Sequence, residues 1–318
     1  MTLNSLNSNK SKFKAIALSL FTLLTGCYTH TILANSNNQQ ATFTSTAQQI
    51  TLHSSITNKD YLIYIASPQQ AAPSTGYPII YLLDGHLTFS RAESLANNLI
   101  EQGIIKPIVI VAIDYQEQWL TFRAQDYTPP HNSTITNDPF IKGEENGGGA
   151  EKFLKFITTE LKPLIEQKYN IDSQQQALFG HSYGGLFTLF TSFTKPESFQ
   201  YYYAASPSIW WDNKAIIRES SHFINSQKTY NKPPQLIISV GGLEQTVPTN
   251  SPAARKEKLV KRNQVTNAKE LANLLSKDAS TKLHTRFFIF PEQNHGAVIP
   301  FAIQQALTSF FSNPPSHH

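Results

Sequence analysis

The sequence is poor in cysteine and in charge. Among its 318 residues Cys27 is the single cysteine, and Asp, Glu, Lys and Arg together make up 15% of the chain. One cysteine excludes an intramolecular disulfide, and no set of His and Cys residues has the spacing of a metal site. We therefore expect no disulfide scaffold, no metal and no other cofactor.

The N-terminal segment supplies much of the formal net charge of +4. Lys10, Lys12 and Lys14 precede an apolar run at residues 15–24, and no acidic residue lies before Cys27. Removing these three lysines from the 26 basic residues leaves 23 against 22 acidic ones, a net charge of +1. Nucleic-acid binding normally requires a basic surface, so such a partner is not expected.

Residues 1–26 have the pattern of an export signal: a basic start, an apolar stretch too short to span a membrane, then small residues before a cysteine. Leu-Thr-Gly-Cys at residues 24–27 resembles the bacterial lipobox and predicts lipidation of Cys27. A signal peptide cleaved elsewhere is the alternative. Tyr28 stands where an acidic residue would favour the inner membrane, so resemblance to bacterial lipoprotein sorting rules implies a lipid anchor on the periplasmic face of a Gram-negative outer membrane.

Residues 27–46, rich in Thr, Asn, Gln and Ser, are typical of a flexible tether, and residues 47–318 form one domain. Strands are expected at residues 50–53, 61–66, 77–83, 108–113, 176–179, 201–205, 236–240 and 285–290, and helices at 89–100, 150–169, 186–190, 254–275 and 302–311. A long polar segment at residues 116–149 interrupts this alternation. The pattern predicts an α/β fold with a mostly parallel central sheet and helices on both faces.

The segment Gly-His-Ser-Tyr-Gly at residues 180–184 has the GxSxG pattern of a serine nucleophile elbow. A strand-like run precedes it and helix-compatible spacing follows it, which is the context that an elbow requires. The serine would adopt strained backbone angles, and side chains in place of Gly180 or Gly184 would collide with the neighbouring helix and strand. Ser182 is therefore the candidate nucleophile; an ordinary strand-to-helix turn is the alternative.

A serine hydroxyl needs a base, and His295 is the best placed of the ten histidines. It lies in a loop directly after the last expected strand. The acid that orients a histidine base should lie between serine and histidine in chain order. Glu244, after the strand at 236–240, is preferred, and Asp212, after the preceding strand, is its rival.

Acyl transfer also requires donors for the developing oxyanion. The backbone amides of Tyr183, next to the nucleophile, and of His86, after the strand at 77–83, are the expected donors. Asp84 precedes the serine in the chain, so we expect it to structure its loop. The glycines at 147–149 lack the Lys-Ser/Thr of a phosphate loop.

Five segments together resemble one family. They are YLLDG at 81–85, RAQDYTP at 123–129, GGAEKF at 148–153, GHSYGG at 180–185 and SPSIWW at 206–211. The set resembles the bacterial esterases that hydrolyse catecholate siderophore trilactones, within the α/β-hydrolase esterase group that includes S-formylglutathione hydrolase. The resemblance covers residues 45–312 and is more specific for the fold and the group than for the substrate.

The resemblance implies a serine esterase that acts on a small-molecule ester through an acyl-enzyme, with a siderophore trilactone, in its iron-free or ferric form, as the preferred substrate. Ser182 and His295 carry over as nucleophile and base, and the amides of His86 and Tyr183 as oxyanion donors. Some members of the group work with a Ser-His dyad, so a triad with Glu244 and a dyad both stay open.

The resemblance also implies substrate contacts. Arg123 is expected either to meet an anionic ligand or to pair with Asp126 as a loop brace. Trp210 and Trp211 are expected either to line a pocket for catechol rings or to cover the core. The alternatives to a siderophore esterase are a general carboxylesterase for acetyl, feruloyl or S-formylglutathione-like substrates, and a non-catalytic binding lipoprotein.

Overall fold

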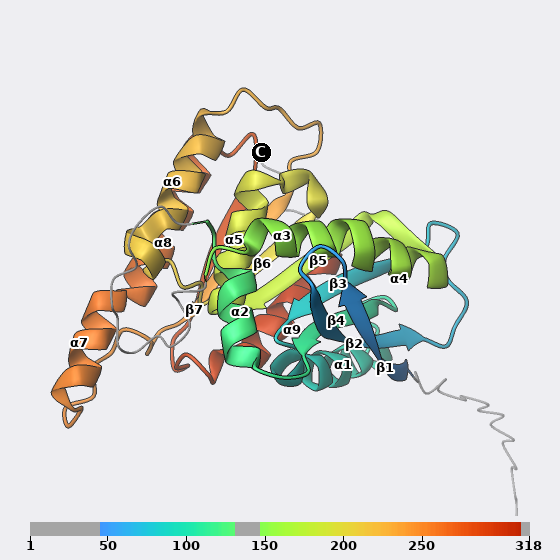
Figure 1. Cartoon of the computed structure of the whole chain (residues 1–318), viewed down its shortest axis with the longest axis horizontal. Coiled ribbons are helices and arrows are strands. Elements are labelled where there is room, and N and C mark those ends of the chain that lie inside the picture. Colours follow the sequence, from blue (N-terminus) through green and yellow to red (C-terminus); the bar gives the residue numbers. More distant parts are fainter. Residues whose placement is uncertain (1–44, 131–146, 313–318) are drawn as a thin grey trace, which may run out of the picture. The chain divides into compact units, whose positions relative to one another are not determined.

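The computed structural model describes residues 45–130 and 147–312 (Figure 1). The expected signal peptide, Cys27 and nearly all of the tether lie outside these residues. No helix in the described part of the chain is long and apolar enough to cross a membrane. The first strand begins at Ser45, two residues before the expected start of the domain.

The strands are β1 (Ser45–Ser54), β2 (Lys59–Pro68), β3 (Tyr77–Leu83), β4 (Val109–Tyr115), β5 (Ile171–His181), β6 (Tyr201–Ala205), β7 (Gln235–Gly241) and β8 (His284–Phe290). The helices are α1 (Gly85–Glu101), α2 (Trp119–Tyr127), α3 (Ala150–Phe156), α4 (Lys162–Lys168), α5 (Tyr183–Thr194), α6 (Trp211–Asn225), α7 (Ala253–Arg262), α8 (Gln264–Asp278) and α9 (Val298–Phe311). Every strand expected from the sequence is confirmed.

Within the described residues the strands form one sheet in the order β1-β2-β4-β3-β5-β6-β7-β8. Strands β3 to β8 run parallel, and the β1-β2 hairpin joins β4 antiparallel. The carboxyl ends of β3, β5, β6 and β7 therefore meet at one edge, which is where parallel α/β sheets bind ligands. This is the α/β-hydrolase architecture.

The central strands of the sheet are buried on both faces, as their apolar sequences require. In β3, Tyr77, Ile79 and Tyr81 pack into one core cluster, and the alternate residues Ile80 and Leu82 pack into a second. Helices α3, α5, α6 and α8 supply the first cluster, and α1 and α9 supply the second. Figure 1 shows these helices on opposite sides of the sheet.

Four helical segments differ from the expectation. The long polar segment contains α2, and an unexpected helix, α6, follows β6 and is kinked by three left-handed residues, Asp212 to Lys214. The helix expected at 150–169 is continuous but widens into a π-helical segment at Ile157–Leu161. The helix expected at 254–275 is two helices, because Asn263 adopts a left-handed conformation with φ 44° between α7 and α8.

Candidate active site

Ser182 lies at the turn between β5 and α5, with φ 61° and ψ −116°. A side chain at position 180 could not be accommodated, since a Cβ on Gly180 would lie 2.1 Å from the carbonyl oxygen of Gly184. The amide of Ser182 donates to the carbonyl of Ala205 at 3.0 Å, which ties the turn to the end of β6. The serine is thus held in a conformation that non-glycine residues rarely adopt, as in a nucleophile elbow.

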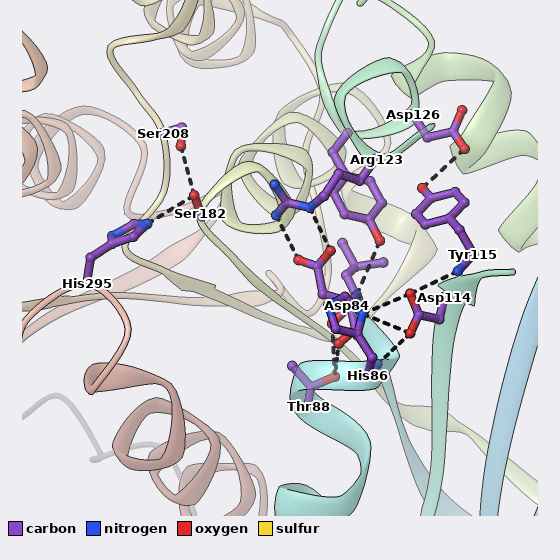
Figure 2. A network of polar contacts seen from close by, with 12 residues as sticks. Asp84, His86, Thr88, Asp114, Tyr115, Arg123, Asp126, Ser182, Ser208 and His295 are labelled. Carbon is purple, nitrogen blue, oxygen red and sulfur yellow. Dashed lines mark hydrogen bonds and ion pairs between the residues drawn. The ribbon is translucent and has the colours of Figure 1, made fainter. Parts of the chain in front are cut away.

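The predicted base and acid come together with this serine. His295 Nε2 lies 3.1 Å from Ser182 Oγ, and His295 Nδ1 lies 2.6 Å from Glu244 Oε2 (Figure 2 shows the serine and the histidine). With the Nδ1 proton donated to the carboxylate, Nε2 can accept the proton of the serine hydroxyl. A second hydroxyl, that of Ser208, lies 3.4 Å from Ser182 Oγ.

Glu244 is held firmly in this arrangement. Its side chain is 1% exposed, and Oε1 accepts hydrogen bonds from the hydroxyl of Ser206 at 2.5 Å and the amide of Gly241 at 2.6 Å. A buried carboxylate needs such partners, because burial without them disfavours its charged form. The rival acid, Asp212, instead lies 3.7 Å from Nη2 of Arg218. The geometry therefore favours Glu244 as the orienting acid.

His181 has a role that the sequence reasoning missed. The histidine is buried, and its Nε2 donates to the carbonyl oxygen of His295 at 2.7 Å. Burial, together with the nearby His295 and Arg123, lowers the pKa of His181 well below its usual value, so the ring is neutral at physiological pH. It anchors the loop that carries His295. Its place inside the GxSxG segment was the only signal, and that signal does not reveal the partner.

The backbone amides of Tyr183 and His86, the two expected oxyanion donors, lie in different hydrogen-bonding environments. Tyr183 is the first residue of α5, and amides of the first turn lie outside the helix's own hydrogen-bond ladder. The amide of His86 instead donates to Oδ2 of Asp114 at 2.6 Å, so the prediction for His86 is wrong. The physical reason is helix capping: Asp84, the N-cap residue of α1, makes no cap with its side chain, and Asp114 at the end of β4 accepts this first-turn amide.

The carboxylate of Asp84 is occupied by Arg123. The guanidinium donates to both carboxylate oxygens, from Nε at 2.7 Å and from Nη2 at 2.8 Å, and both side chains are nearly buried (Figure 2). Burial acts to lower the pKa of Arg123, but the Asp84 charge outweighs it and the pKa is raised. The expected pairing with Asp126 is wrong, because Asp126 accepts from Lys59 and Tyr61.

This ion pair lies against the elbow. The guanidinium carbon of Arg123 is 5.4 Å from the ring centroid of Tyr183, and a Cβ on Gly184 would lie 3.6 Å from Oδ2 of Asp84. The arrangement favours the brace over the anion contact for Arg123, since its charge and two of its donors, Nε and Nη2, are engaged by Asp84.

The two tryptophans also differ. Trp211 is 2% exposed and packs in the core, so the prediction that it contacts substrate is wrong. Trp210 is half-buried, and its ring centroid lies 6.0 Å from that of Tyr183, beside the nucleophile. Trp210 therefore stays a candidate for the wall of the site.

Fold and site together define a serine hydrolase of the α/β-hydrolase class. The Esterase family model, described as "Putative esterase", matches residues 54–286, and the chain belongs to this family. Ferri-bacillibactin esterase BesA of Bacillus subtilis is 35% identical over 267 residues, covering 82% of this chain and 88% of that protein. The siderophore enterobactin esterase of Emericella nidulans is 35% identical over 251 residues, covering 74% and 82%.

A solved structure shows the same fold. Siderophore hydrolase EstB from Aspergillus nidulans superposes with a TM-score of 0.73 at 28% identity, covering 86% of this chain and 97% of that one. The family expected from the sequence motifs is thus confirmed.

Proposed function

We propose that this protein is a serine esterase that opens the ester bonds of a catecholate siderophore and so takes part in iron acquisition. The observation that carries the proposal is the hydrogen-bonded series Ser182, His295 and Glu244 on a strained elbow at the carboxyl edge of the sheet. The relatives named above are esterases of ferri-bacillibactin and of enterobactin, which supports this substrate class.

In the proposed reaction Ser182 Oγ attacks the ester carbonyl carbon while His295 Nε2 takes the hydroxyl proton. Glu244 holds the imidazole through Nδ1 and stabilises the imidazolium that forms. His295 then gives the proton to the departing alkoxide oxygen, which leaves an acyl-enzyme and a free hydroxyl. A water molecule, deprotonated by His295, attacks the acyl carbon and releases the acid from Ser182.

The tetrahedral intermediates carry a negative charge on the former carbonyl oxygen. The amide of Tyr183 at the N-terminus of α5 is the donor that we propose for this oxygen, since helix N-termini favour negative charge. Removal of one such donor typically costs about 3 kcal/mol of transition-state stabilisation.

The direct test compares three substrates with residues 28–318, which include the whole of β1: an enterobactin-type trilactone without iron, its ferric complex, and p-nitrophenyl acetate. The proposal predicts ring opening of the trilactone, followed by mass spectrometry of the linear products, and no ring opening by Ser182→Ala. Efficient hydrolysis of p-nitrophenyl acetate with no trilactone cleavage would instead mark a general carboxylesterase. Binding of the ferric complex without hydrolysis of any ester would mark a binding protein.

We also propose that the protein is anchored by a lipid on Cys27 to the periplasmic face of the outer membrane. The support is the basic, apolar and lipobox-like order of residues 1–27. Cys27→Ser should abolish incorporation of labelled palmitate and move the full-length protein out of the detergent phase. Unchanged partitioning of this variant would contradict the anchor.

A further inference from the structure

Helix α7 is the most basic element of the described structure. Over ten residues it carries five cationic side chains and the single acidic Glu257. These cations are Arg255, Lys256, Lys258, Lys261 and Arg262. None of the helix's residues is buried, so the exposed cations of α7 create a positive electrostatic potential around the helix, including its C-terminal end.

The end of α7 lies at the active site. The guanidinium carbon of Arg262 is 4.2 Å from the ring centroid of Trp210, which is within cation–π distance. The Trp210 ring in turn packs against Tyr183, the residue next to the nucleophile. Arg262, Trp210 and Tyr183 thus form a continuous series from the basic helix to Ser182.

The backbone at Arg262 is fixed by the residues that follow it. The left-handed Asn263 ends α7 directly after the arginine, and Nδ2 of Asn267 donates to the carbonyl of Arg262 at 2.9 Å. Nε2 of Gln264 donates to the carbonyl of Pro207 at 2.7 Å. The end of the helix is therefore tied to the loop that carries Trp210. This contact holds Arg262 and Trp210 in place relative to each other.

We propose that Arg262 stacked on Trp210 is the subsite that binds one catecholate arm of a ferric siderophore. The inference rests on the proposed function and deepens it. A ferric tris-catecholate is an anion, because three doubly deprotonated catechols outweigh the trivalent iron, and its aromatic rings match a flat, positively charged surface. Arg123 cannot fill this role as well, since its charge is paired with Asp84 at the brace.

The test measures binding separately from turnover. In a Ser182→Ala background, the dissociation constant for ferric enterobactin is obtained from quenching of tryptophan fluorescence. Adding Arg262→Gln should weaken binding about tenfold, and the effect should shrink as salt rises. Arg262→Lys keeps the charge but loses the planar stack, so its dissociation constant should lie between those of the parent protein and Arg262→Gln.

Arg255→Gln is the matched control, because it makes the same change in charge on the same helix two turns, about 10 Å, away. This control should weaken binding less than about twofold. In the active enzyme, Arg262→Gln should lower the ratio of kcat/KM for ferric over iron-free trilactone about tenfold, mainly through KM.

Equal losses of affinity for ferric enterobactin in Arg262→Gln and Arg255→Gln would overturn the subsite. They would show that only the overall positive potential of α7 contributes to binding. Equal losses on ferric and iron-free trilactone would show that Arg262 merely supports Trp210, and would also overturn it. Failure of the wild-type enzyme to cleave either trilactone is a different result, because that outcome contradicts the proposed function itself.

Discussion

Two histidine–carboxylate pairs lie at the carboxyl edge of the sheet, and they differ in what surrounds them. His295 contacts Glu244 through Nδ1 and faces Ser182 through Nε2. His86 contacts both oxygens of Asp114 through Nδ1, at 3.0 and 2.9 Å, and its ring packs edge-on against Trp119 at 4.7 Å. The imidazole of each pair is held by a carboxylate, yet only the first presents its second nitrogen to a nucleophile.

The carboxylates explain the difference. Asp114 also accepts the amides of His86 and Tyr115, so it joins the start of α1 to the end of β4 (Figure 2). Glu244 lies in a loop, and its other oxygen is satisfied by Ser206 and Gly241. A histidine–carboxylate pair is therefore not a catalytic signature by itself; the group that faces the free ring nitrogen decides its role.

The sharpest way to test this comparison is to remove each histidine. His295→Ala should lower kcat by about a thousandfold or more, because the serine loses its base. Ser182→Ala should lower kcat by as much, and the double variant should lower it no further, since the two residues act as a unit. His86→Ala should lower kcat less than about tenfold. Assays with p-nitrophenyl acetate give all four values, and a His86→Ala loss as large as that of His295→Ala would contradict the assignment.

The two carboxylates provide the next contrast. Glu244→Gln should lower kcat by about a hundredfold or more with little change in KM, because a loose or wrong imidazole tautomer harms only the transition state. Asp114→Asn should act mainly on stability, by about 1–3 kcal/mol, since it weakens buried hydrogen bonds to two amides and a histidine. Urea unfolding and steady-state kinetics on both variants separate the effects.

Two further outcomes are informative for the acids. If Glu244→Gln costs less than about tenfold, or roughly 1.4 kcal/mol, the site works as a Ser-His dyad. Asp212→Asn is the control for the rival acid and should leave kcat nearly unchanged, because its contact is with Arg218.

The Arg123–Asp84 pair gives a smaller effect on catalysis and a larger one on stability. Arg123→Ala leaves a buried carboxylate unpaired beside the elbow, so we expect destabilisation of about 3–5 kcal/mol. Activity on ferric trilactone and on p-nitrophenyl acetate should then fall by the same factor. The double variant Arg123→Ala/Asp84→Asn should recover stability. A loss restricted to the ferric substrate would instead restore Arg123 as an anion contact.

The sequence predicted the sheet and the candidate residues Ser182, His295 and Glu244 for a physical reason. Buried parallel strands appear as apolar runs, and Ser182, Glu244 and His295 each follow a parallel strand at the same edge of the sheet. Chain order therefore made these three residues candidates for one site, and left Asp212 open as the rival acid.

The contacts that the sequence could not predict depend on side-chain directions in the packed structure. Asp84 is 39 residues from Arg123 in the chain and Asp126 is a near neighbour, yet the fold pairs Arg123 with Asp84 and leaves Asp126 to Lys59 and Tyr61. Trp210 and Trp211 are neighbours in the chain, yet the start of α6 turns one toward the site and the other into the core. The capping of His86 by Asp114 likewise requires the pairing of β3 with β4.

Substitution of His181 should change activity only slightly but should change the dependence of stability on pH. Its folded pKa is lowered, chiefly by burial, while in the unfolded chain it returns to about 6.5. Below that pH the unfolded state binds a proton that the folded state does not, so stability falls as the pH drops, by at most about 1.4 kcal/mol per pH unit. Above pH 7 this contribution to stability is fully present.

His181→Gln removes the titrating ring but keeps an N–H donor near the carbonyl of His295. The free energy of unfolding of the variant should therefore fall less steeply between pH 6.5 and 5 than that of the wild type. The difference in slope should correspond to the uptake of at most one proton on unfolding. Its kcat at pH 8 should fall only severalfold, because the His295 loop is less rigid while the base itself remains. Urea midpoints at pH 5, 6.5 and 8 measure the difference, with His284→Gln as the control for a histidine on the exposed start of β8. Parallel pH profiles for wild type and His181→Gln would show that His181 is protonated in the folded protein, and would remove it as the neutral anchor of the catalytic loop.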